Sequence, residues 1–370
     1  MTSRRGVSGV ARREFLRRCA ALGLSSSTVS LLLGCVTKRT PPPTDETAAS
    51  AAGPLERELR IFNWSDYIGR TTVADFEREF GVRVSYDTFE SNEELVAKLV
   101  AGGGGYDIIC PTGYIVTLLA EGGLLQPLDH GVLSNWSNLL PLFVDQGVDP
   151  AGRYAMPYQW GISGVAYRSD LVEAPPESWG AFAEPGLRGR ATMLDDGREV
   201  LGAMLRWRGH SLNAIDPALL AEARRDALAI KPNLRAYISA AVKGQLISGD
   251  IAAAQLFLSD ARMARDEESR VAFTVPREGS TLYADYLAMP RDAPNRRAAH
   301  AFLNYVLRAE VGAAISNDAG GASPNGAALP LLVDPVPPPD AALMARLEVQ
   351  RDLGAATDLW DRMWTEVKAG

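Results

Sequence analysis

The sequence predicts an α/β fold with about two domains, each with a parallel sheet that has helices on both faces. Three observations support this fold class. The chain has 370 residues, of which 46% are hydrophobic, which is enough for sizeable cores. Short apolar runs alternate with amphipathic stretches from residue 57 onward, as in consecutive βαβ units. The same alternation resumes after residue 189. The composition excludes disordered, collagen-like and polytopic membrane proteins.

The first half of the body has clear element signals. Gly81 ends an amphipathic helix, and Ser91 begins a capping box for the next one. We expect strands at 59–62, 82–86 and 106–110, and helices at 72–80, from Ser91 onward and at 115–120.

The second half repeats this pattern with weaker strand signals. An apolar run at 189–194 leads into a helix at 199–207. We expect further helices at 217–230, 295–315, 340–351 and 357–368, and a strand at 251–258.

The N-terminus reads as an export signal. Arg12 and Arg13 form a twin-arginine motif, and an uncharged stretch of about 16 residues follows, shorter than the roughly 20 that span a bilayer. This stretch ends in Leu-Leu-Gly-Cys, which resembles a bacterial lipobox with Cys35 as the lipidated residue. We expect a signal at 1–35 and a Pro-rich linker at 36–56. An uncleaved anchor helix is the alternative.

Charge and cysteine content narrow the function further. The chain carries a net charge of −7, but residues 1–40 hold eight basic side chains and one acid, so the remainder has 30 basic and 44 acidic side chains, a net of −14. This acidic body argues against nucleic-acid binding and favours cationic ligands or simple solubility.

Cys110 is the lone cysteine of the body, which excludes a disulfide within it, and a packed thiol is the expectation.

Motifs for catalysis are absent from the sequence. The three histidines are widely spaced, and neither a zinc motif, a G-x-S-x-G elbow nor a P-loop occurs. The glycine run at 102–105 precedes a strand rather than opening a helix, so we interpret it as a turn. We therefore expect no catalytic residues, no metal and no cofactor.

Aromatic residues and acids instead gather where strands end and helices begin. Ligands of open α/β sheets bind at such ends, and aromatic faces together with carboxylates suit a desolvated ammonium. The segments are 63–67, 111–114, 195–199, 257–260 and 283–285.

These segments carry a family resemblance over about residues 58–370. Together with the runs at 90–93, 157–161, 285–290 and 350–356, their order and spacing resemble the spermidine/putrescine-binding proteins of ABC importers. The resemblance implies a two-lobed periplasmic-binding-protein fold of type II that holds a polyamine between its lobes. It implies lobe 1 at 57–161 and 284–328, and lobe 2 at 162–283 and 329–370.

The resemblance also implies the ligand-binding residues. The aromatic walls are Trp64 and Tyr67, with Phe257 in place of a usual Trp and Tyr283 in place of a Trp or Phe. The acids are Asp196, Glu199 and Asp285, and Asp260 matches an acid of the putrescine-preferring branch. The remaining polar positions are Ser65, Asp66, Thr112, Tyr114 and Gln350. Gly321 stands where an aromatic ring is expected.

Each assignment has a structural alternative. Asp196 and Glu199 also fit a helix capping box, and Asp260 fits an N-cap. The aromatic residues fit a core. Asp285 interrupts an apolar strand, and its partner is either a ligand cation or Arg198 or Arg262.

The functional expectation is a lipid-anchored, periplasmic, monomeric binding protein that delivers putrescine or spermidine to an ABC permease. Its partners are then the polyamine, the permease and, through the lipid anchor, the membrane. The alternatives are an exported hydrolase acting on amine-bearing substrates, and the same fold binding another cationic solute.

Overall fold

The computed structural model describes residues 53–101, 105–144, 148–239 and 241–370. The export signal, Cys35 and the linker up to residue 52 lie outside these ranges. The chain divides into two compact units. Unit 1 comprises residues up to Gln159, Ala284–Asp318 and Ser323–Pro335, and unit 2 comprises Trp160–Tyr283, Ala319–Ala322 and Val336–Gly370.

Two long strands contain unit boundaries, namely β4 (Ala155–Arg168) and β9 (Ser280–Ala288). The other helices and strands of unit 1 are β1 (Glu58–Trp64), α3 (Thr72–Phe80), β2 (Arg83–Phe89), α4 (Asn92–Val100), β3 (Ile108–Ile109), α5 (Gly113–Glu121), α6 (Pro141–Val144), α11 (Arg296–Val306) and α12 (Ala309–Ala319), whose last residue belongs to unit 2.

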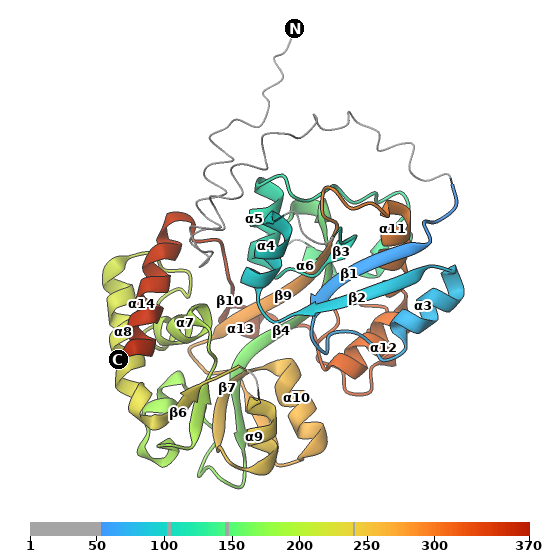
Figure 1. Cartoon of the computed structure of the whole chain (residues 1–370). Helices are drawn as coiled ribbons and strands as arrows, with labels where there is room; N and C mark the ends of the chain where they lie inside the picture. The colour runs from blue at the N-terminus through green and yellow to red at the C-terminus, as the bar shows by residue number, and fades with distance from the viewer. Residues whose placement is uncertain (1–52, 102–104, 145–147, 240) are drawn as a thin grey trace. The chain divides into compact units, whose positions relative to one another are not determined.

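The sheet of unit 1 has the order β2-β1-β3-β9. Strand β1 pairs in parallel with β2 and β3, and β9 pairs antiparallel to β3 through Ile109 and Ala288. Because the chain steps from β1 to β2 and then back across β1 to β3, right-handed crossovers place α3 and α4 on opposite faces (Figure 1). Strand β1 is accordingly buried on both faces, with Leu59, Ile61 and Phe62 at most 1% exposed.

Local signals in unit 1 match the expected helix ends. Gly81 has φ 66° and donates its N–H to the Glu77 carbonyl, which ends α3. The Ser91 side chain accepts from the Glu94 N–H and begins α4. Cys110 is a buried free thiol, as expected.

Unit 2 contains β5 (Ala191–Met193), α7 (Gly197–Trp207), α8 (Pro217–Ile230), β6 (Leu234–Tyr237), α9 (Val242–Ser248), β7 (Ala253–Phe257), α10 (Leu258–Glu267), β8 (Val271–Thr274), α13 (Ala341–Met344), β10 (Leu347–Val349) and α14 (Thr357–Ala369). Strands β6, β5 and β7 run parallel, while β4 runs antiparallel to β7 and β8.

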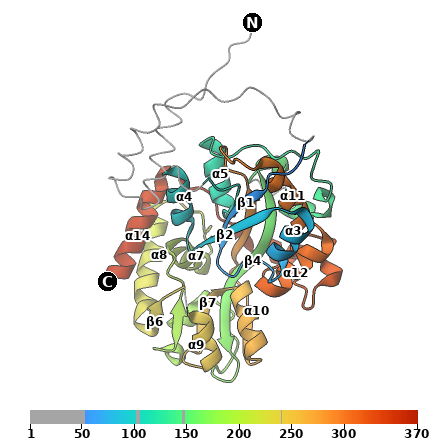
Figure 2. The same cartoon turned by 45° about the vertical axis from the view of Figure 1, so that its right-hand side comes forward.

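Two hydrophobic cores cover the two faces of this sheet. One joins the sheet to α7, α8 and α14, with Trp179 and Trp360 among its largest buried side chains. The other joins it to α9 and α10. Figure 2 shows α8 and α14 side by side and α9 beside α10.

Two sequence expectations were wrong in detail. The helix expected at 295–315 is interrupted after Val306 and forms α11 and α12. The helix expected at 340–351 is only the four-residue α13, and β10 follows it. Strand β10 pairs with β9 through Leu347 and Ser280, and the Glu348 carboxylate accepts from Arg206 Nη1 and Ser211 Oγ. These tertiary contacts override the local helical pattern.

Within the described ranges, no helix combines the length and the apolar character that crossing a membrane requires.

Candidate functional site

Asp285, one of the predicted ligand-binding acids, belongs to unit 1 and is buried at 6% exposure on β9. An isolated antiparallel bridge pairs its backbone with Thr112, which directly precedes α5. The Thr112 hydroxyl donates to Asp285 Oδ1 at 2.7 Å, and the Tyr67 hydroxyl donates to Oδ2 at 2.8 Å. The structure therefore brings these three predicted residues together.

Asp285 has no ion-pair partner in the part of the chain that the structure describes. Burial raises the pKa of its carboxyl to about 6, although the hydroxyls of Thr112 and Tyr67 lower it. The two arginines named as alternative partners belong to unit 2 and donate to other groups of that unit. Arg198 donates to the Arg351 carbonyl and to Asn213, and Arg262 donates to the Gly320 carbonyl.

Two of the predicted aromatic residues, Trp64 and Tyr67, lie at the end of β1 and just after it. The Trp64 ring, at the end of β1, lies 4.4 Å from the Phe89 ring between centroids, and its buried Nε1 has no acceptor among the described residues. The Tyr67 ring lies 5.8 Å from that of Tyr158, whose hydroxyl donates to the Tyr67 carbonyl. Trp64 thus retains an N–H that a ligand or water can satisfy.

Ser65 and Asp66 differ from these residues because both are exposed. The Ser65 hydroxyl donates to the Glu90 carboxylate at 2.5 Å, and Asp66 adopts φ 53°, in the left-handed region. Neither forms a hydrogen bond to Asp285 among the described contacts.

Asn92, which the sequence analysis did not identify as a site residue, links Tyr114 to Thr112. Asn92 Nδ2 lies 3.1 Å from Thr112 Oγ1 and 3.3 Å from the Tyr114 hydroxyl, and Asn92 Oδ1 accepts from the Thr112 N–H. Asn92 therefore orients the Thr112 hydroxyl that donates to Asp285. It lies in the 90–93 run, which is the signal that could have identified it.

Asp196 directly precedes α7 in unit 2 and Glu199 lies in its first turn, and the two carboxylates have different hydrogen-bond partners. Asp196 is the N-cap, and its Oδ1 accepts from the N–H groups of Arg198 at 2.7 Å and Glu199 at 3.1 Å. The capping alternative is thereby confirmed for Asp196. Glu199 does not reach back as in a capping box, since its carboxylate contacts other elements.

Glu199 is also buried, at 4% exposure. Its Oε1 accepts from Gln350 Nε2 at 2.7 Å, and its Oε2 accepts from the Thr281 hydroxyl at 3.4 Å. Burial, with a smaller contribution from the nearby Asp196 charge, raises its pKa to about 7. No cationic side chain forms an ion pair with it in the described structure. Thr281, two residues before Tyr283 on β9, was missed because its role depends on a contact with α7.

Phe257, Asp260 and Tyr283 lie around the β7–α10 junction of unit 2. The rings of Phe257 and Tyr283 are 5.2 Å apart between centroids at 77°. Gly161 lets Tyr283 approach β4, because a Cβ there would lie 2.2 Å from the Tyr283 hydroxyl oxygen. Phe257 is the N-cap of α10 and Asp260 lies inside the first turn, so the N-cap alternative for Asp260 was wrong.

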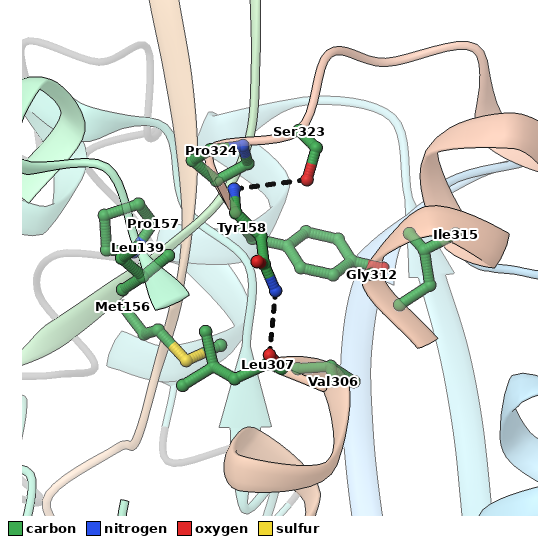
Figure 3. Close-up of a pocket in the computed structure, with 11 residues that line it drawn as sticks. Leu139, Met156, Pro157, Tyr158, Val306, Leu307, Gly312, Ile315, Ser323 and Pro324 are labelled. Atoms are coloured by element: carbon green, nitrogen blue, oxygen red, sulfur yellow. Dashed lines mark hydrogen bonds between the residues drawn. The ribbon is translucent and has the colours of Figure 1, made fainter. Parts of the chain in front are cut away.

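A small pocket in unit 1 lies apart from these predicted residues. Leu139, Met156, Pro157 and Ile315 give it an apolar lining, and Asn325 bonds the Leu307 carbonyl beside it (Figure 3). None of the predicted ligand-binding residues lines this pocket. Without a carboxylate, it does not suit a cation.

Asp285 in unit 1 and Glu199 in unit 2 are therefore buried carboxylates whose hydrogen-bond donors are all neutral side chains. Two other buried acids of unit 1, Asp107 and Asp149, differ because they accept from main-chain N–H groups. A carboxylate removed from water prefers a cation, and neighbouring aromatic faces add to the attraction. The chemistry of these residues suits binding of positively charged amines.

Comparisons with known proteins agree with this chemistry. The putrescine/cadaverine-binding protein of Pseudomonas aeruginosa is 33% identical, over 87% of this chain and 96% of that protein. The putrescine-binding periplasmic protein PotF of Escherichia coli is 36% identical, over 85% and 92%. Among solved structures, the Tp0655 (TpPotD) lipoprotein of Treponema pallidum is 29% identical with a TM-score of 0.78, covering 84% of this chain and 99% of that one.

The family of bacterial extracellular solute-binding proteins matches residues 71–343. This match covers most of the chain and includes the helix that carries Glu199 and the strand that carries Asp285. The chain therefore belongs to that family.

Proposed function

We propose that this protein captures a polyamine, putrescine or spermidine, outside the cytoplasm and delivers it to an ABC permease. The observation that carries the proposal is the pair of buried acids, Asp285 and Glu199, that lack a cationic side chain among the described residues. Each of these acids can receive one ammonium group of a polyamine. Each ammonium taken out of water needs an acidic partner, because an unpaired buried charge costs several kcal/mol.

The relatives support the polyamine as substrate class. Their names specify putrescine, cadaverine or spermidine, and the similarity extends over at least 84% of this chain. We further propose that units 1 and 2 are the two lobes implied by the sequence.

The proposed location rests on the N-terminal residues, which lie outside the described ranges. Arg12 and Arg13 direct export and Cys35 carries the lipid anchor in this proposal. Support comes from periplasmic relatives and from the structural similarity to a lipoprotein of Treponema pallidum.

The first prediction concerns ligand affinity, and it compares the wild type with the variant Glu199→Gln. Calorimetric titration with putrescine, cadaverine, spermidine and spermine should show binding to the wild type, and the variant should lose about 100-fold or more in affinity. A wild-type protein that binds none of the four amines, or turns one over, would refute the proposed function.

The same substitution should stabilise the ligand-free protein. Folding raises the pKa of Glu199 from 4.5 to about 7, so ionisation destabilises the folded state, and stability falls as pH rises through this window. At pH 8 the neutral Gln should therefore raise the free energy of unfolding by roughly 1–3 kcal/mol. Denaturant titrations at pH 4.5 and pH 8 measure this, with exposed Glu184→Gln as the control. A variant that is equally destabilised at both pH values would contradict the raised pKa of Glu199 in the folded protein.

The second prediction concerns chain length. Asp260 adds an acid two residues after the start of α10, beside Phe257. An additional acid favours a diamine with closely spaced charges, so putrescine should bind at least as tightly as spermidine. Asp260→Ser should shift the affinity ratio about tenfold toward spermidine. Asp266→Ser, in the same helix, is the matched control, and an unaltered ratio in Asp260→Ser would reject the role of Asp260.

The third prediction concerns the anchor. Mass spectrometry of protein recovered from membranes should find a mature chain that begins at a lipid-modified Cys35. Cys35→Ala should abolish the lipid adduct, whereas Cys19→Ala should leave it unchanged. An unmodified wild-type chain would exclude lipidation at Cys35.

A further inference from the structure

The turn at residues 63–67, which carries Trp64 and Tyr67, is held by a buried amide. Asn63 lies near the end of β1 and is 1% exposed. Its Oδ1 accepts from the Trp64 main-chain N–H at 2.8 Å, and its Nδ2 donates to the Tyr67 main-chain carbonyl at 3.2 Å. Asparagine side chains stabilise turns by bonding to nearby backbone groups in this way. One side chain therefore joins the start of the turn to its end.

The hydrogen bonds of Asn63 also fix the orientation of its amide. Its Nδ2 donates in addition to the hydroxyl of Tyr86, on the neighbouring strand β2, at 2.8 Å. A flipped amide would place its oxygen against the Tyr67 carbonyl oxygen and its N–H groups against the Trp64 N–H. Asn63 therefore uses both N–H groups and its carbonyl oxygen in contacts within unit 1.

Tyr158 on β4 holds the end of the same turn from another strand. It is 8% exposed, and its hydroxyl donates to the Tyr67 carbonyl at 2.7 Å. Its ring meets the Tyr67 ring edge-on, with the centroids 5.8 Å apart and the planes at 75°. The Tyr67 carbonyl thus accepts from two buried side chains, which occupy both of its lone pairs.

These contacts matter because the middle of the turn is not stable by itself. Asp66 adopts φ 53°, in a region that few residues other than glycine occupy. Ser65 and Asp66 are both exposed, so their side chains add little packing. The conformation of the turn therefore depends on the buried contacts that Asn63 and Tyr158 make at its ends.

The turn in this conformation brings one side chain to the candidate site. The Tyr67 hydroxyl donates to Asp285 Oδ2 at 2.8 Å, and this donor lowers the pKa of the Asp285 carboxyl against the effect of burial. We propose that Asn63 and Tyr158 are positioning residues for amine binding, because they hold the turn that brings the Tyr67 hydroxyl to Asp285. This inference rests on the proposed function, and in it both residues act through Tyr67.

The first measurement is the pKa of Asp285 in the mature protein without ligand, by carbon-13 NMR of its carboxyl carbon, assigned with Asp285→Asn. Tyr158→Phe removes only the hydroxyl and keeps the ring. Because Tyr67 then donates less well, the pKa of Asp285 should rise by roughly 0.5 to 1. Cys110 and Tyr286 interact with the same carboxylate, but burial raises the pKa of both, so they stay neutral during the titration.

The second measurement is a double-mutant cycle on the affinity for putrescine at pH 7, by calorimetry. Tyr158→Phe should weaken binding about fivefold and Tyr67→Phe about tenfold. If Tyr158 acts through Tyr67, the double variant should bind no more weakly than Tyr67→Phe alone. Asn63→Ala should show the same dependence on Tyr67, and Tyr158→Phe serves as the test if loss of the Asn63 amide unfolds the protein.

The matched control is Tyr106→Phe, which also removes a hydroxyl that donates to a carboxylate of unit 1, that of Asp87 at 2.8 Å. It should change neither the pKa of Asp285 nor the affinity. An unchanged pKa of Asp285 in Tyr158→Phe would overturn the positioning role, and so would a fivefold loss that persists in the Tyr67→Phe background. Either result in a wild type that binds putrescine would leave the proposed function intact. A wild type that binds no polyamine would refute the proposed function, and a role in amine binding with it.

Discussion

Burial of a carboxylate without a cationic partner is the constraint on which the candidate site depends. Such a group is unfavourable in a folded protein, and the chain tolerates it at both Asp285 and Glu199. Neutral donors lessen the penalty without removing it, which is why the pKa values of both carboxyls remain raised. A ligand cation relieves the penalty, so the unfavourable burial in the free protein becomes a source of affinity in the complex.

The fold sustains this arrangement with rigid elements. Asp285 sits on a strand whose backbone is paired at Thr112, and its two hydroxyl donors come from segments that follow β1 and β3. Glu199 sits in the first turn of α7, where the Asp196 cap holds the backbone and Gln350 and Thr281 fix the carboxylate. Each acid is therefore positioned by contacts between segments far apart in the sequence.

Sequence reasoning succeeded where the signal is local, and the family resemblance supplied Gln350 as a site residue without its contact to Glu199. The α/β class, the helix ends at Gly81 and Ser91, and the charge of Asp285 within an apolar strand are all visible in short windows. It failed where partners are distant. Thr281 and Gln350 contact Glu199 across 82 and 151 positions, and the replacement of an expected helix by β10 depends on pairing with β9.

The most direct measurement of the central claim is the number of protons exchanged when putrescine binds. At pH 6.5 the acids of the free protein are partly protonated, with pKa values of about 6 for Asp285 and about 7 for Glu199, while the amines already carry their protons. A bound cation favours the ionised acids, so binding should release about one proton, measured by calorimetry in buffers of different ionisation enthalpy. The release should vanish near pH 9. Binding with no release at pH 6.5, or with proton uptake, would contradict the account.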